Sequence, residues 1–150
     1  GSEMCIRDRL YGDAILVGQS SVYSTDPVDV AVDYADYNFL NAVILIESEA
    51  SAEEWLVRLG AVEKELGRVR SGERNEPRTV DIDILYAGCC IIDSIDLTVP
   101  HPRWRERNFV LAPLAEVRPH LMLPGEPRAV MHVWRSLIAE ERVERVIESW

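Results

Sequence analysis

Two stretches of the chain, residues 15–23 and residues 39–47, show the patterning of β-strands. Successive side chains on a strand point to opposite faces, so each stretch is expected to present two distinct faces. In the second stretch, one face carries Leu40, Ala42, Ile44 and Ile46, and the other carries Phe39, Asn41, Val43 and Leu45. Residues 26–36 lie between the two stretches, hold several aspartates and lack apolar periodicity, which predicts a loop.

A helix is predicted from Ser51 to about Leu66. Ser51 and Glu54 form a capping-box signature at its start, and Gly67 supplies the stop. Glu63 lies at the border of the apolar stripe, where partial burial and a solvated position are equally open. The stripe itself consists of Trp55, Leu56, Leu59, Val62 and Leu66. Shorter helices are predicted over residues 108–116 and 130–139, whereas residues 143–150 fit either a strand or a helix.

Residues 80–85 have the clearest period of two in the chain. Apolar residues at 80, 82 and 84 alternate with Asp81 and Asp83, which predicts a half-buried strand with both carboxylates on one face, about 7 Å apart. A turn at Ala87-Gly88 and a short return strand over residues 89–92 are expected to follow. Prolines keep residues 97–102 extended, and residues 119–127 are predicted to form a loop.

Composition and charge describe an ordinary globular chain. At 150 residues, 47% hydrophobic and 28% charged, it is expected to form a single domain over residues 10–150. The net charge of −10 argues against nucleic-acid and anionic-membrane partners, and no apolar run reaches membrane-spanning length. Three cysteines without metal-binding spacing indicate reduced thiols and a cytoplasmic location. We expect a monomer.

The Asp81–Asp83 pair is the candidate chemical centre, because aspartate packs poorly in strands. Paired carboxylates can hold Mg²⁺ while leaving coordination positions open for substrate phosphates, although a solvated strand face explains the pair equally well. Seven of the 16 cationic residues are arginines that flank the pair, and guanidinium groups bind phosphate bidentately. This clustering favours a Mg²⁺-bound polyphosphate over surface salt bridges. The seven are Arg68, Arg70, Arg74, Arg78, Arg103, Arg105 and Arg107.

The order and spacing of several motifs resemble the 6-hydroxymethyl-7,8-dihydropterin pyrophosphokinase family. The most specific signal is a Pro-Arg-Thr-Val-Asp-Ile-Asp run at residues 77–83, followed by Val-Pro-His at residues 99–101. The likeness covers about residues 13–125 and includes segments at 20–28, 39–42, 63–74 and 107–114. It implies an α+β, ferredoxin-like fold in which helices pack on an antiparallel sheet.

The same resemblance implies transfer of the β,γ-diphosphate of ATP to the hydroxymethyl group of the pterin, with release of AMP, in folate biosynthesis. Asp81 and Asp83 would hold two Mg²⁺ ions, and Asp83 would also help to activate the attacking hydroxyl. Arg68 and Arg78 match the arginines of the family's catalytic loop. The implied ATP contacts are Arg70, His101 and Arg107. The implied pterin contacts are Thr25, Phe39, Asn41 and Phe109.

The chain also departs from the family pattern. Asn75 stands where a tryptophan is common, and Pro102 stands where some members have a tyrosine. Residues 1–9 resemble a cloning scar followed by adapter-derived sequence, so we expect the native chain to begin near residue 10. The family's first strand and first helix are not apparent, which suggests truncation or a chimeric start. We therefore expect exposed sheet edges, low stability and weak activity.

Two other kinds of function remain open from the residues. One is a Mg²⁺-dependent nucleotidyltransferase or nuclease built on the aspartate pair, and the other is an inactive nucleotide-binding fragment of the same fold. The motif spacing favours the pyrophosphokinase over both.

Overall fold

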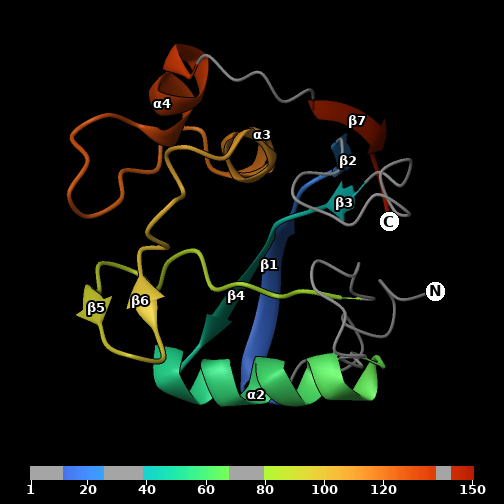
Figure 1. Ribbon diagram of the computed structural model, residues 1–150, viewed down its shortest axis with the longest axis vertical. Coiled ribbons are helices and arrows are strands. Elements are labelled where there is room, and N and C mark those ends of the chain that lie inside the picture. Colours follow the sequence, from blue (N-terminus) through green and yellow to red (C-terminus); the bar gives the residue numbers. More distant parts are fainter. Residues whose placement is uncertain (1–11, 26–38, 68–79, 138–142) are drawn as a thin grey trace.

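The computed structural model describes residues 12–25, 39–67, 80–137 and 143–150. The described strand pairings are all antiparallel, and helices pack beside the strands, which confirms the α+β class (Figure 1). The loop predicted over residues 26–36 lies outside the described residues. The elements are β1 (Ala14–Gln19), β2 (Val22–Thr25), β3 (Phe39–Asn41), β4 (Ile44–Ser48), α2 (Ala52–Glu65), β5 (Ile92–Asp93), β6 (Thr98–Val99), α3 (Asn108–Val117), α4 (Val130–Ser136) and β7 (Val143–Ile147).

Each of the two long strands predicted near the N-terminus is divided in two by a bend. β1 pairs with β4, whereas β2 pairs with β3 on one side and β7 on the other. The two bends are bonded to each other, because the Ser20 amide donates to the Val43 carbonyl and the Val43 amide donates to Ser20 Oγ, both at 2.8 Å. The prediction of continuous strands is wrong here because the Ser20 hydroxyl replaces a regular ladder bond with a side-chain bond.

The C-terminal segment forms a strand, which answers the choice left open for residues 143–150. β7 pairs antiparallel with β2 and places Arg145 opposite Tyr23. Beyond the strand, the Trp150 indole donates a hydrogen bond to the Ser20 carbonyl at 2.7 Å. The side-chain amide of Gln19 donates to the Trp150 carbonyl at 2.6 Å. The last residues of the chain therefore hold the same bend that joins β1 to β2.

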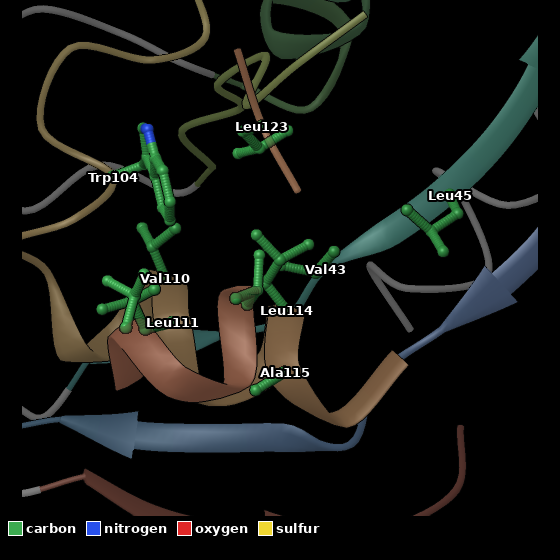
Figure 2. Close-up of a cluster of buried hydrophobic side chains, with 10 residues drawn as sticks. Val43, Leu45, Trp104, Val110, Leu111, Leu114, Ala115 and Leu123 are labelled. Atoms are coloured by element: carbon green, nitrogen blue, oxygen red, sulfur yellow. The ribbon is translucent and has the colours of Figure 1, made fainter. Parts of the chain in front are cut away.

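The hydrophobic core lies between the β3–β4 bend and the two C-terminal helices (Figure 2). Leu111 and Leu114 of α3 are fully buried. So is Val130, and the side chain of Trp104 is only 1% exposed. Val43 is also buried, whereas Leu40 is 62% exposed. The face predicted to carry Val43 and Leu45 is thus the core face. Burial of this kind contributes roughly 25 cal/mol per Å² of apolar surface.

Helix α2 begins as predicted and crosses beneath the lower ends of β1 and β4 (Figure 1). Ser51 Oγ accepts a hydrogen bond from the Glu54 amide at 3.1 Å, which is half of the expected capping box. Trp55 and Val62 are buried on its inner side. At the other end, Gly67 adopts a φ of +82°, which favours glycine and ends the helix. Among the described residues, no helix is long and apolar enough to cross a membrane.

The return strand predicted over residues 89–92 is shorter and starts later than expected. The turn is present, with Gly88 at a φ of +56° and the Cys90 amide bonded to the Ala87 carbonyl at 3.0 Å. The strand itself begins only at Ile92, in a two-residue pairing between β5 and β6. The turn residues keep their backbone bonds within the turn, so the ladder cannot start before Ile92.

Two side chains of β1 remain open to solvent. Ile15 is 63% exposed and Val17 is 40% exposed, although both belong to a strand. Among the described residues this strand pairs only with β4, and the link between these exposed side chains and a missing first strand stays a prediction.

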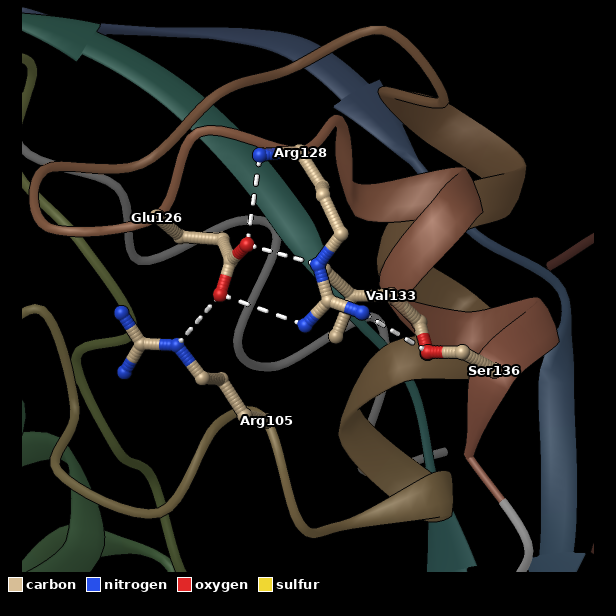
Figure 3. A network of polar contacts seen from close by, with 5 residues as sticks. All are labelled: Arg105, Glu126, Arg128, Val133 and Ser136. Carbon is tan, nitrogen blue, oxygen red and sulfur yellow. Dashed lines mark hydrogen bonds and ion pairs between the residues drawn. The ribbon is translucent and has the colours of Figure 1, made fainter.

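A carboxylate network ties the loop before α4 to the rest of the chain (Figure 3). Glu126 accepts from Arg128 Nε at 2.7 Å and from Arg105 Nε at 3.0 Å. Arg128 also donates to Ser136 Oγ at 3.1 Å, which links the network to the end of α4. The hydrogen bonds from Arg128, supported by Arg105, lower the pKa of Glu126 to about 2. Arg105, one of the seven flanking arginines, is therefore engaged in a structural contact.

We predict that Glu126→Gln lowers the free energy of unfolding at pH 7 and that this difference disappears in acid. A lowered carboxyl pKa stabilises the fold above the ordinary value of 4.5, and the effect is lost as the pH falls towards 2. Urea unfolding across that pH range measures it, with the exposed Glu144→Gln as the control. A difference that stays constant down to pH 2 would contradict this.

A second prediction concerns the bend. Ser20→Ala leaves the buried Val43 amide without its acceptor, which costs about 1–3 kcal/mol. Urea unfolding at pH 7 measures the loss, and the exposed Ser149→Ala is expected to stay within about 0.5 kcal/mol of the parent. Equal stabilities of the two variants would show that the bend does not depend on this hydroxyl.

Candidate active site

The segment that carries the aspartate pair is not a strand in the structure. Residues 80–86 have no ladder partner among the described strands, and a strand requires a neighbour to bond with. The predicted alternation is nevertheless present, because Asp81 and Asp83 are exposed while Ile82 and Ile84 are half-buried. In Figure 1 the segment runs above α2 towards the β5–β6 hairpin. The period-2 pattern was right, and the secondary structure inferred from it was wrong.

The buried Glu63 holds this segment in place of a strand partner. Glu63 is only 6% exposed, and its Oε1 accepts a hydrogen bond from the Ile82 amide at 3.0 Å. Ile82 stands between Asp81 and Asp83, so the bond fixes the backbone midway between the two carboxylates. Of the two positions considered for Glu63 from the sequence, the structure shows the buried one. A carboxylate that accepts from a backbone amide forms one of the stronger hydrogen bonds in proteins.

Beside Asp83 lies an open cleft of about 260 Å³. Polar and apolar groups line it in nearly equal measure, and the polar ones belong to Asp83, Asp96, Thr98 and His101. The walls come from α2, from the aspartate segment and from the chain around β6. The lining residues are Leu56, Ile82, Asp83, Ile84, Ile95, Asp96, Leu97, Thr98, His101 and Pro102.

His101 joins the cleft to the aspartate segment. Its amide donates to the Leu85 carbonyl at 2.7 Å, and its Nδ1 accepts from the Arg103 amide at 3.2 Å. Burial lowers the pKa of His101 below 6.5. The negative charge of Asp83 raises this pKa, whereas the positive charges of Arg107 and Arg103 lower it. The imidazole is therefore neutral at pH 7. With Nδ1 accepting, its proton lies on Nε2 as a hydrogen-bond donor.

The arginines that follow the aspartate segment have different environments. Arg103 pairs with Glu106 at 3.3 Å on the exposed surface, and Arg105 is bound to Glu126, as described above. Arg107 stacks its guanidinium over Phe109, 5.4 Å from the ring centre. Within the described part of the chain it forms no ion pair with a carboxylate. Of the three arginines that follow the segment, Arg107 therefore remains the candidate phosphate ligand. Arg68, Arg70, Arg74 and Arg78 lie outside the described residues.

The residues expected to contact the pterin come together on β2, β3 and α3. Thr25 lies opposite Phe39 in the ladder, and Asn41 Nδ2 donates to Thr25 Oγ1 at 3.2 Å. Helix α3, whose first turn carries Phe109, packs against both strands. Thr25 is buried and the other three are half-buried. Thr25, Phe39 and Asn41 are thus neighbours, Phe109 lies on the helix that packs against their strands, and the roles of all four remain predictions.

Several residues that line the cleft were not predicted as site residues from the sequence. Leu56 was assigned to the core stripe of α2, and Thr98 to an extended segment, but both line the cleft. Thr98 lies three residues before His101 in the same motif, which was the available signal. Asp96 and Ile95 carried no signal, since only the turn between β5 and β6 brings them to the cleft.

The exposed aspartate pair suits a hard divalent cation. Asp81 and Asp83 offer carboxylate oxygens on one side of the segment, the ligands that Mg²⁺ prefers. Among the described residues, no group of three or more His, Cys, Asp or Glu side chains forms a closed metal cage. An open carboxylate pair of this kind fits a metal that shares its remaining positions with substrate phosphates and water.

Exposed carboxylates beside an open cleft on an antiparallel α+β fold suit a protein that binds metal-bound phosphates. The family model of 7,8-dihydro-6-hydroxymethylpterin-pyrophosphokinase (HPPK) matches residues 5–119. The chain belongs to this family, whose fold is ferredoxin-like.

Curated relatives carry related names. The 2-amino-4-hydroxy-6-hydroxymethyldihydropteridine pyrophosphokinase of Bacillus subtilis is 46% identical over 65% of this chain and 56% of its own length. The protein of the same name from Haemophilus influenzae is 43% identical over 73% of this chain and 66% of its own. The folic acid synthesis protein fol1 of Pneumocystis carinii is 43% identical over 57% of this chain and 12% of its own. The chain thus spans less than two thirds of each of the three.

We predict that Glu63→Ala releases the aspartate segment. The Ile82 amide loses its carboxylate acceptor, so its hydrogen-exchange rate should rise by about tenfold or more. Exchange followed by NMR measures it, with Glu63→Gln, which keeps one acceptor oxygen, expected to fall in between. The exposed Glu53→Ala in the same helix is the matched control. Unchanged exchange at Ile82 in Glu63→Ala would show that something else holds the segment.

Proposed function

We propose that this protein transfers the β,γ-diphosphate of ATP to the hydroxymethyl group of 6-hydroxymethyl-7,8-dihydropterin and releases AMP, a step of folate biosynthesis. Family membership supports the reaction class. The observation that carries the proposal is the meeting of Asp83 and His101 on one cleft. That combination suits a nucleotide whose base lies in the cleft and whose phosphates lie towards the charged groups.

The ATP phosphates would lie near His101 and Arg107. His101, whose pKa is lowered below 6.5 by burial, offers an Nε2 proton to a phosphate oxygen. The Arg107 guanidinium, stacked on Phe109, keeps its donors available to a bidentate phosphate contact. Arg70 would add a third contact and lies outside the described residues.

The pterin would lie against the β2–β3 strands and α3. Phe39 and Phe109 are flat rings that can stack on a heterocycle, and Asn41 supplies an amide with donors and acceptors for its edge. The bond from Asn41 to Thr25 leaves the other amide positions open to a ligand. A site that hydrogen-bonds a substrate edge in this way discriminates strongly against analogues that lack those groups.

Asp81 and Asp83 would hold two Mg²⁺ ions. When bound, such ions neutralise phosphate charge and orient the reacting oxygens. The residues of the chain contribute positioning. Asp83 would accept a proton from the attacking hydroxyl, and Arg68 and Arg78 would clamp the transferred phosphates. Transfers of this kind rest mainly on such positioning and electrostatics.

We further propose that the protein acts as a cytoplasmic monomer on small-molecule substrates, with no nucleic-acid or membrane partner. The net charge of −10 supports the absence of a nucleic-acid or anionic-membrane partner, because most of the surface repels polyanions. Size-exclusion chromatography with light scattering tests the monomer.

We predict that the protein forms AMP from ATP only when Mg²⁺ and the pterin are both present, and that Asp83→Asn lowers the rate by about 10² or more. Coupled detection of AMP measures it. The exposed Asp93→Asn, on β5 outside the cleft, is the matched control and should keep the parent rate. Chelation with EDTA should abolish activity in the parent.

Other outcomes would point to the other functions considered. Cleavage of nucleic acid that needs Asp83 but no pterin would indicate a nuclease. Binding of ATP without AMP formation, in a protein that unfolds cooperatively, would indicate an inactive nucleotide-binding fragment. Either result would overturn the proposed reaction.

A further inference from the structure

A carboxylate in the last turn of α3 bonds directly to β2. Glu116 Oε1 accepts from the Ser21 amide at 2.8 Å and from the Tyr23 hydroxyl at 3.0 Å, and its Oε2 accepts from Ser21 Oγ at 2.6 Å. Ser21 and Tyr23 are both buried. One side chain thus takes up two donors from Ser21, in the bend just before β2, and one from Tyr23 within β2.

The cation opposite this cluster comes from β7. Arg145 pairs across the ladder with Tyr23, and its guanidinium lies 6.0 Å from the Tyr23 ring centre. The hydrogen bonds from Ser21 and Tyr23, with the charge of Arg145, outweigh burial and lower the pKa of Glu116. Glu116 is therefore ionised at neutral pH. β7 lies beyond the residues matched by the family model, so this support belongs to the C-terminal part of the chain.

The two elements joined by Glu116 are the two walls of the predicted pterin site. Helix α3 carries Phe109 in its first turn and Glu116 in its last. β2 carries Tyr23 and, two residues on and on the same face, Thr25, which is bonded to Asn41 of β3. A change in how β2 sits on α3 would therefore move the Thr25–Asn41 pair relative to Phe109.

We propose that Glu116 is a positioning residue for the pterin site, which sets the placement of α3 against the β2–β3 strands. It does not touch the pterin itself. It acts by keeping the aromatic wall on α3 at a fixed distance from the hydrogen-bonding edge at Asn41. The inference rests on the proposed function, since it needs a pterin between these walls, and it adds a residue outside the predicted contacts.

A purely structural role and a positioning role predict different results. If Glu116 only stabilised the fold, its loss would affect both substrates equally once the protein is folded. If it positions the pterin walls, its loss should weaken pterin binding and leave ATP binding unchanged. The nucleotide cleft is lined from α2, residues 82–84 and residues 95–102, which Glu116 does not contact.

The test measures two dissociation constants by titration calorimetry on variants shown to be folded by circular dichroism. One is for α,β-methylene-ATP with Mg²⁺, and the other is for 6-hydroxymethyl-7,8-dihydropterin with that analogue bound. We expect Glu116→Ala to weaken pterin binding by about tenfold and to leave the nucleotide constant within about twofold. Glu116→Gln, which keeps one acceptor oxygen, should recover part of the loss.

Two further variants complete the design. Tyr23→Phe removes one hydroxyl and should weaken pterin binding by about threefold, which keeps the test open if Glu116→Ala does not fold. Glu126→Ala removes a carboxylate that is also bound by several donors but lies on the α4 side, so it should leave both constants unchanged.

Each result has a definite reading. Selective loss of pterin affinity in Glu116→Ala and Tyr23→Phe, with Glu126→Ala normal, supports the inference. Equal weakening of both ligands, or no change in either, overturns it and leaves the proposed function intact, provided that the parent binds the pterin. A parent that binds the nucleotide analogue but no pterin overturns the proposed function and the inference together.

Discussion

The hydrogen bond from the Ile82 amide to the buried Glu63 carboxylate is the constraint on which the candidate site depends. The segment has no neighbouring strand among the described residues, and its far end is held by the bond from the His101 amide to the Leu85 carbonyl. Glu63 supplies the missing bond from a helix. The carboxylates of Asp81 and Asp83 can then point to solvent on one side while Ile82 and Ile84 stay half-buried.

Carboxylates that are hydrogen-bonded within the fold help to explain how an acidic chain can present a site for a polyanion. Glu116 and Glu126 are each bound by several donors, so both serve the fold, and neither is among the residues that line the cleft. Arg105 is used in the same way and is unavailable to phosphate. Arg107 stacks on an aromatic ring and keeps its donors available. The local potential at the cleft is thus set by a few charges and not by the net charge of −10.

Patterns of period two and the capping signals gave correct information about faces and helix ends. The core face with Val43 and Leu45, the cap at Ser51 and the exposure of the aspartate pair all follow from side-chain spacing. The bends at Ser20 and Val43 could not be predicted, because a serine hydroxyl replaces a backbone partner only when two distant segments meet. The same holds for Glu116, whose partners Ser21 and Tyr23 lie 95 and 93 residues away in sequence.

Helix α3 is the element that joins these contacts into one arrangement. Arg107 precedes its first turn, Phe109 lies within it and Glu116 stands in its last turn. Its buried middle, Leu111 and Leu114, fixes the helix in the core, so neither end can shift independently. The proposed phosphate contact at Arg107, which caps the helix, and the proposed pterin contact at Phe109 would therefore lie two residues apart on one fixed support. An in-line transfer requires that its two substrates be held in a fixed relative position.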